Sequence, residues 1–143
     1  MIKIICVGKI KEDYLKEMIN DYSKRIIKYH KLEIIELPDN NKEEEGKKIL
    51  SQMNIGYNIS LSIDGLKRNS EEFAQLIDKT LMYQANINFI IGGSDGISNE
   101  VLDKCDMHLS FGNMTYPHGM FRGILLEQIY RAFKILNNES YHK

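Results

Sequence analysis

Short apolar segments recur along the chain and alternate with stretches that have a helical repeat. Residues 2–7 form a nearly continuous β-branched run, interrupted only by Lys3 and ended by Gly8, which is typical of a strand covered on both faces. A later run alternates apolar and polar residues and stops at Asp64 and Gly65, a turn signal. These patterns predict five strands, at residues 2–7, 32–37, 58–63, 87–91 and 107–111.

Helical spacing fills the intervals between the predicted strands. Apolar residues fall on one side of a helix over residues 11–30, and Asn69 with Glu72 forms the signature of a capping box before a second stripe. Ser98 has the side chain of an N-cap for a short helix. Residues 39–53 begin polar and acidic, and we interpret them as a surface excursion with a short helical stretch.

The longest helical stripe lies in the last third of the chain. Pro117 suits the start of this helix, because its ring fixes φ and its missing N–H has no partner in a first turn. Gly119 and Gly123 follow, although glycine costs about 1 kcal/mol relative to alanine inside a helix. We therefore expect close backbone approach there. The stripe predicted to face the core comprises Phe121, Leu125, Ile129, Ala132, Phe133 and Leu136.

The alternation of strands and helices predicts an α/β fold with a mostly parallel sheet and helices on both faces. A chain of 143 residues suits a single domain that spans residues 1–143. In such sheets ligands bind beyond the carboxyl ends of the strands. Three loops are therefore candidate binding loops, at residues 61–67, 92–97 and 111–118.

The glycine-rich loop at residues 92–96 is the most recognisable of the three. It opens toward a predicted helix N-terminus, so its backbone N–H groups are available to a polar or anionic ligand. The loop matches neither the dinucleotide-binding pattern nor the P-loop. A plain strand-to-helix turn explains it equally well.

Composition narrows the class of protein further. Hydrophobic residues make up 43% and charged residues 27%, as in ordinary globular domains. The apolar start is too short for a signal peptide or a membrane span, which places the protein in the cytoplasm. Cys6 and Cys105 lack metal-ligand spacing, so we expect buried thiols and no metal.

A formal net charge of −1 restricts any contact with RNA to a local patch. Several charged residues of the last helix lie off its apolar stripe, and a solvated face explains them as well as RNA binding does. The basic candidates lie near the two ends of the chain: Lys9, Lys11, Arg122, Arg131, Lys134, His142 and Lys143.

The sequence contains no recognisable nucleophile motif of the Ser-His-Asp or Cys-His type, and its four histidines are scattered along the chain. His108 lies in a strand pattern and is interpreted as structural. For His118, after Pro117, capping, ligand binding and no role remain equal alternatives. His142 belongs to the ending Tyr141-His142-Lys143, which sets an aromatic, a titratable ring and a base side by side. A frayed terminus is the default interpretation of such an ending.

Motifs from separate regions, taken together and in order, change that interpretation. The sequence closely resembles the ribosomal large-subunit methyltransferase H family of the SPOUT class, and the match spans essentially the whole chain. Two departures are a short acidic segment after Pro38 and the glycines at 119 and 123. The resemblance rests on Val7-Gly8-Lys9, Ile91-Gly92-Gly93-Ser94-Asp95-Gly96, Leu109-Ser110-Phe111, Met114-Thr115-Tyr116-Pro117-His118, Arg122, Leu126-Glu127-Gln128-Ile129-Tyr130-Arg131-Ala132 and Tyr141-His142-Lys143.

The resemblance implies a homodimer whose C-terminal segment forms a trefoil knot around bent S-adenosylmethionine. It further implies methylation of N3 of a pseudouridine in large-subunit rRNA, on the assembled ribosome, without a metal. Carried onto this chain, the cofactor-binding positions are Leu61, Gly92, Phe111, Gly112, Asn113, Met114, Thr115 and Tyr116. These positions fall in the three candidate loops.

Methyl transfer from a sulfonium needs alignment more than side-chain chemistry, which fits the scarcity of catalytic motifs. The proton on the acceptor nitrogen must leave, so within the resemblance His142 is the candidate base. Arg131, Glu127 and Tyr141 are the other catalytic candidates, with Glu127 orienting Arg131 or the tail. The candidate RNA-binding residues are Arg122, Arg131, Tyr141, His142 and Lys143.

Two rival functions stay open at this stage. One is a SPOUT methyltransferase that acts on tRNA. The other is a ribosome-binding factor that has lost catalysis.

Overall fold

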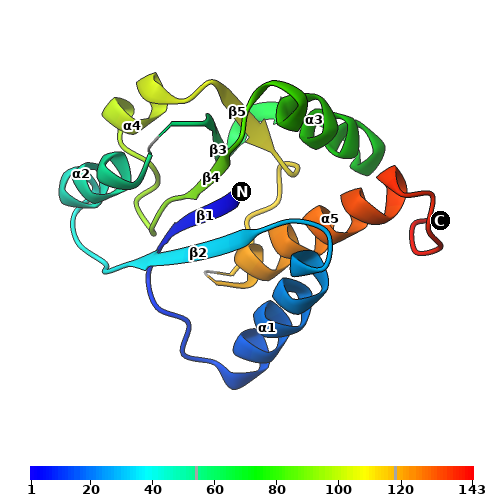
Figure 1. Cartoon of the computed structure of the whole chain (residues 1–143). Helices are drawn as coiled ribbons and strands as arrows, with labels where there is room; N and C mark the ends of the chain where they lie inside the picture. The colour runs from blue at the N-terminus through cyan, green and yellow to red at the C-terminus, as the bar shows by residue number, and fades with distance from the viewer. Residues whose placement is uncertain (54, 118) are drawn as a thin grey trace.

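The computed structural model of the protein describes residues 1–53, 55–117 and 119–143. Strands and helices alternate along the chain (Figure 1), as the hydrophobic pattern predicts. The elements are β1 (Ile2–Val7), α1 (Asp13–Ile27), β2 (Leu32–Leu37), α2 (Lys42–Gln52), β3 (Tyr57–Lys67), α3 (Ser70–Tyr83), β4 (Ile87–Ile91), α4 (Asn99–Lys104), β5 (Met107–Ser110) and α5 (Met120–Leu136).

The five strands form one sheet in the order β2-β1-β4-β3-β5, and every neighbouring pair is parallel. The predicted parallel sheet is therefore confirmed. All six residues of β1 are buried, as its continuous apolar run indicates. Because the strands are parallel, their carboxyl ends lie along one edge, where the loops leading into the helices gather.

Helices cover both faces of the sheet (Figure 1), with α1, α5 and α3 on one face and α2 and α4 on the other. The larger core packs Phe89 and Ile4 of the sheet against Leu125 and Ile129 of α5. On the other face Val101 of α4 packs with β1 and β4. The chain enters α5 from β5 at the sheet edge, yet α5 lies between α1 and α3.

The apolar stripe of α5 faces the core as predicted. Its central residues are buried, and Phe121 and Leu136 are partly buried against the same core. Gly123 allows the close approach that the sequence suggests, because a Cβ there would lie 2.6 Å from Sδ of Met18 on α1. The helix begins at Met120, three residues later than Pro117 suggests, because Gly119 has a φ of +89° that a helix does not accept.

Asp64 and Gly65 do not end β3, so this prediction is wrong. The strand continues to Lys67, and Leu61 and Leu66 both pair with Leu109 of β5. Residues 62–65 therefore form a bulge, and a Cβ at Gly65 would lie 2.7 Å from the carbonyl carbon of Leu109. The turn signal marks a break in strand register.

The prediction for residues 39–53 is correct for the helix and wrong for its exposure. Asn41 caps α2 by accepting the N–H of Glu44. Glu45 and Ile49 are buried, and Gly46 packs against Ser98. The sequence gives little sign of this contact face, because residues 42–48 are all charged except Gly46. The predicted caps at Asn69 and Ser98 are both present.

Candidate functional site

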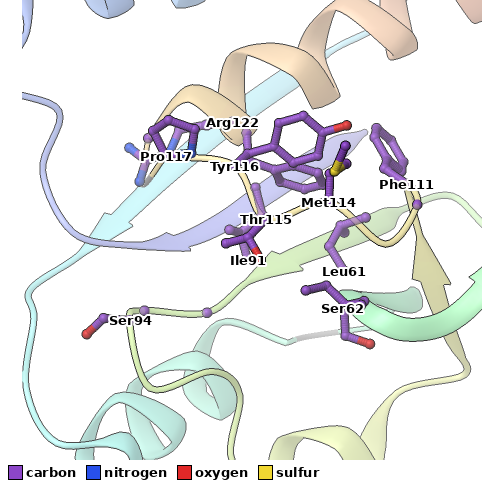
Figure 2. Close-up of a pocket in the computed structure, with 16 residues that line it drawn as sticks. Leu61, Ser62, Ile91, Ser94, Phe111, Met114, Thr115, Tyr116, Pro117 and Arg122 are labelled. Atoms are coloured by element: carbon purple, nitrogen blue, oxygen red, sulfur yellow. The ribbon is translucent and has the colours of Figure 1, made fainter.

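A cavity of about 270 Å³ opens at the carboxyl edge of the sheet (Figure 2). Its walls come from the bulge of β3, the loop after β4 and the segment between β5 and α5. In Figure 2 Leu61 and Ser62 lie on one side of the hollow, Ser94 on another, and Thr115 and Tyr116 above them. The three candidate loops chosen from the strand pattern thus converge on one site.

Main-chain groups form the wall that follows β4. A Cβ at Gly92 would lie 2.8 Å from the carbonyl oxygen of Gly96 and 2.7 Å from Cγ1 of Ile97. The turn is closed by the N–H of Gly96, which donates to the carbonyl of Gly93 at 3.0 Å. A side chain at position 92 would displace this turn, so the loop offers backbone to the cavity.

Aromatic side chains form the opposite wall. The ring centroids of Phe111 and Phe121 lie 5.2 Å apart, and those of Tyr116 and Phe121 lie 5.6 Å apart. Ser110 fixes the start of this segment, because its hydroxyl accepts the N–H of Gly112 at 3.1 Å. The cavity is consequently an apolar slot flanked by main-chain groups, which suits a flat heterocycle with a few polar atoms.

Arg122 braces the site from the first turn of α5. Its guanidinium donates to a carboxylate oxygen of Glu36 at 2.6 Å and to the carbonyls of Gly8 at 3.1 Å and Val7 at 3.4 Å. The same Glu36 oxygen accepts the N–H of Ile10. Arg122 therefore joins α5 to the carboxyl ends of β1 and β2.

The burial of Arg122 contradicts its predicted place on a solvated face. The residue is only 2% exposed, so it offers no surface to an RNA phosphate. The helical spacing correctly placed Arg122 off the apolar stripe of α5. However, the side of the first turn that carries Arg122 packs against the carboxyl ends of β1 and β2. Its Nε has no hydrogen-bond partner among the described residues, although it is buried beside the cavity.

Most of the predicted cofactor-binding residues line the cavity. Asn113 does not; it is exposed. Contact with a cofactor stays a prediction for all of them. The members that line the cavity are Leu61, Gly92, Phe111, Gly112, Met114, Thr115 and Tyr116.

Several lining residues were not among the named cofactor-binding positions. The bulge brings Ser62 and Ile63 into the wall; both lie in the candidate loop at residues 61–67, but only Leu61 of that loop was named. Phe121 was assigned to the core alone, although it also closes the cavity. The others border positions that were chosen and are Ile91, Gly93, Ser94, Pro117 and Gly119.

The four predicted catalytic residues gather at the other end of α5. Arg131 donates to Oε1 of Glu127 at 2.8 Å, and its Nη1 lies 3.1 Å from Nδ1 of His142. The hydroxyl of Tyr141 donates to the same Glu127 oxygen at 3.3 Å. Nε2 of His142 lies 2.8 Å from a carboxylate oxygen of Glu71 on α3. We call Glu127, Arg131, Tyr141 and His142 the tail cluster.

The electrostatics of the tail cluster follow from these contacts. The hydrogen bond from His142 holds the pKa of the Glu71 carboxyl below its ordinary value, and the bond to Glu127 raises the pKa of Arg131. Burial raises the pKa of the Tyr141 hydroxyl, so it stays protonated at neutral pH. The Tyr141 ring packs edge-on against Tyr130, with centroids 4.8 Å apart. Thus the default interpretation of a frayed tail does not hold.

Within one protomer the tail cluster and the cavity are separate. Arg131 follows Arg122 by nine residues, which is about 14 Å along a helix. None of the four residues of the tail cluster lines the cavity. Lys143 is exposed beyond the cluster, and His118 lies outside the described residues.

Neither a metal site nor a membrane-spanning helix is found in the part of the chain that the structure describes. No group of three His, Cys, Asp or Glu side chains there is arranged to hold a metal ion. No helix among those residues has the length and apolarity to cross a membrane.

Comparison with known proteins identifies the family. Residues 1–142 match the model described as "Predicted SPOUT methyltransferase". Ribosomal RNA large subunit methyltransferase H from Carboxydothermus hydrogenoformans is 49% identical, and that from Clostridioides difficile is 50% identical; each alignment covers 99% of both chains. The corresponding methyltransferase H 1 of Clostridium perfringens is 47% identical, with the same coverage.

Solved structures share the fold at much lower identity. A methylase family protein from Haemophilus influenzae aligns with a TM-score of 0.59 at 16% identity, over 99% of this chain and 70% of that one. The SpoU methyltransferase AviRb from Streptomyces viridochromogenes, solved with the cofactor AdoMet, aligns with a TM-score of 0.51 at 12% identity, over 90% and 56% of the two chains. The chain therefore belongs to the SPOUT methyltransferases and, within them, to the ribosomal RNA large subunit methyltransferase H family.

Proposed function

We propose that the protein is an S-adenosylmethionine-dependent methyltransferase of 23S rRNA. It transfers a methyl group to N3 of a pseudouridine on the assembled ribosome, in the cytoplasm and without a metal. The observation that carries the proposal is the full-length relationship to methyltransferase H proteins, at 47% to 50% identity. The cavity supports it, because the residues predicted to hold the cofactor line one hollow.

The residues around the cavity fit S-adenosylmethionine. Phe111, Tyr116 and Phe121 supply a slot for adenine, and the turn at Gly92 supplies main-chain hydrogen-bonding groups for the ribose. The unpartnered Nε of Arg122 beside the cavity suits a ligand that carries a carboxylate. When bound, the cofactor supplies an activated methyl group on its sulfonium. The chain then contributes alignment of the acceptor with that group.

The acceptor nitrogen must lose its proton, and His142 is the residue proposed to receive it. Imidazole is the side-chain group most often used as a general base. His142 of the same protomer is held in the tail cluster by Glu71 and Arg131. Because that cluster is remote from the cavity, we propose a homodimer in which His142 of the partner subunit completes each site.

The path of the chain supports a trefoil knot. The segment from Phe111 to Pro117 leaves the edge strand β5 and passes the bulge of β3 and the loop after β4 on its way to α5. Arg122 then ties α5 to the ends of β1 and β2. Threading of this segment through the loop after β4 would hold the cavity walls together.

RNA contacts are proposed for the C-terminal end of α5 and the tail. Arg131 and Lys143 supply positive charge for phosphates, and Tyr141 supplies a ring for base stacking. Arg122 is withdrawn from this set because it is buried.

Mass spectrometry of rRNA nucleosides from cells with and without the gene tests the proposed function. We expect N3-methylpseudouridine in large-subunit rRNA only when the gene is present, and its return with a plasmid copy. An unchanged rRNA profile with a lost tRNA methylation would favour the tRNA enzyme instead. Ribosome binding without calorimetric binding of S-adenosylmethionine would favour a factor without catalysis.

A further inference from the structure

A second cavity of about 310 Å³ lies between the start of α3, the end of β5 and the middle of α5. It adjoins the cavity described above, because Phe111 and Tyr116 line both. It also adjoins the tail cluster, because its lining residue Gln128 donates to Glu127 at 3.1 Å, and its lining residue Ser70 directly precedes Glu71, which contacts His142. The second cavity thus stands between the proposed cofactor slot and the tail.

The lining of the second cavity has the chemistry of a nucleobase pocket. Phe73, Phe111 and Tyr116 offer aromatic surface, and the rings of Phe73 and Phe111 meet edge-on with centroids 5.7 Å apart. Base stacking on such side chains is worth about 1–3 kcal/mol per base. Arg68 lies exposed in the lining, where a guanidinium can meet the phosphate beside the base.

Gln128 is the group that can distinguish one base from another. Its Nε2 donates to a carboxylate oxygen of Glu127 at 3.1 Å, and its Oε1 accepts from the hydroxyl of Ser70 at 2.7 Å. A carboxylate only accepts hydrogen bonds, so the nitrogen of the amide must face Glu127. One N–H and one oxygen lone pair of this fixed amide remain for a ligand.

We infer, resting on the proposed function, that the second cavity holds the target pseudouridine base and that Gln128 recognises it. Pseudouridine is joined to its ribose through carbon, which leaves an N1–H next to the C2 carbonyl. The oxygen of Gln128 accepts from this N1–H, and its remaining N–H donates to the C2 carbonyl oxygen. This pairing leaves N3 free for methylation.

The same pairing explains a preference for pseudouridine over uridine. Uridine carries a C–H where pseudouridine carries the N1–H, so the half-buried oxygen of Gln128 keeps only its bond from the Ser70 hydroxyl and its second lone pair faces a C–H. Losing this second hydrogen bond in a half-buried site disfavours the wrong ligand by about 10- to 100-fold. Gln128 is therefore a specificity-determining residue.

The test compares ribosomes that carry pseudouridine at the target position with ribosomes that carry uridine there. We expect the wild-type protein to prefer the pseudouridine ribosomes by roughly 10- to 100-fold in kcat/KM for methyl transfer. In Gln128→Leu, and in Gln128→Met as a second variant of similar shape, kcat/KM on pseudouridine falls to the level on uridine. The rate on uridine stays about the same.

Matched controls separate recognition from folding. Gln75→Leu makes the same change on the exposed side of α3 and should retain the wild-type preference. Calorimetric affinity for S-adenosylmethionine should stay within about twofold of wild type in all three variants. A wild-type preference in Gln128→Leu or Gln128→Met overturns the assignment. A wild-type protein that methylates neither ribosome overturns the proposed function itself, and the assignment with it.

Discussion

The two ends of α5 border regions of different composition. At its start, beside Arg122, the helix borders a slot made from backbone turns and aromatic rings. At its end, the tail cluster joins Glu127, Arg131, Tyr141 and His142 through mutual hydrogen bonds. The slot is thus defined mainly by its shape, whereas the tail cluster consists of ionisable side chains.

This difference matches a division of labour in methyl transfer. A donor that arrives already activated needs a pocket of fixed shape, so the slot needs few polar side chains. Proton removal and RNA binding need charges and acid-base groups, and these are the roles that we propose for the tail cluster. Changes in the two regions should therefore alter different measured quantities.

The largest expected effect comes from displacing the turn that forms one wall of the slot. Gly92→Val places a side chain where even a Cβ would lie 2.8 Å from the carbonyl oxygen of Gly96. We expect calorimetric affinity for S-adenosylmethionine to fall at least about 100-fold, the equivalent of roughly 2.8 kcal/mol. Asp95→Ala alters the exposed tip of the same turn and should bind normally. Wild-type affinity in Gly92→Val would refute the slot as the cofactor site.

Removing the brace beneath the slot should cost stability. In Arg122→Met the ion pair with Glu36 and the bonds to the carbonyls of Val7 and Gly8 are lost. Breaking a buried pair costs about 3–5 kcal/mol, and the partial exposure of Glu36 reduces the loss to roughly 2–3 kcal/mol. Urea unfolding at pH 7 measures it. Additive losses in a double-mutant cycle with Glu36→Gln would show that the pair is not coupled.

His142→Ala tests the tail independently of the slot. We expect turnover of methyl transfer to ribosomes to fall about 10- to 100-fold, because proton removal at N3 loses its base. Affinity for S-adenosylmethionine should remain that of wild type, since His142 lies outside the slot. A fall in cofactor affinity with normal turnover would reverse the assignment of the two regions.

The smallest expected effect is an increase in the mobility of the C-terminal tail at acidic pH, while the slot stays folded. The docked state lowers the pKa of Glu71 below its ordinary value of 4.5 through the bond with His142. This contribution to tail docking is present above pH 4.5 and is lost as the pH falls through the lowered pKa. Backbone NMR relaxation of residues 140–143 should report increasing motion there while core resonances persist. Motion that is independent of pH would contradict the contact.

The sequence was most informative where local patterns and tertiary structure agree. The positions of β1 and α5 were predicted correctly, because burial on both faces gives a strand a continuous apolar run and burial of one side gives a helix a 3.6-residue apolar repeat. The loops that make the slot also followed from strand order, since parallel strands carry their ligands at one edge.

Other features depended on contacts that leave no such trace. The bulge of β3 looked like a strand end at Gly65, because close packing against β5 and a tight turn both require glycine. Arg122 looked solvent-exposed because its partners, Gly8 and Glu36, are distant in the sequence. The contact of the tail cluster with α3 could not be found from spacing, because Glu71 and His142 are 71 residues apart in the sequence.

The brace formed by Arg122 has a consequence for how the protein is made. Its bond to the carbonyl of Gly8 spans 114 residues, so the end of the first strand can gain this contact only after the last helix has been synthesised. Contacts of such long range form late and slow the folding of a domain. A nascent chain therefore lacks the proposed cofactor slot until almost all of it has been synthesised, and a chain truncated before residue 122 cannot acquire it.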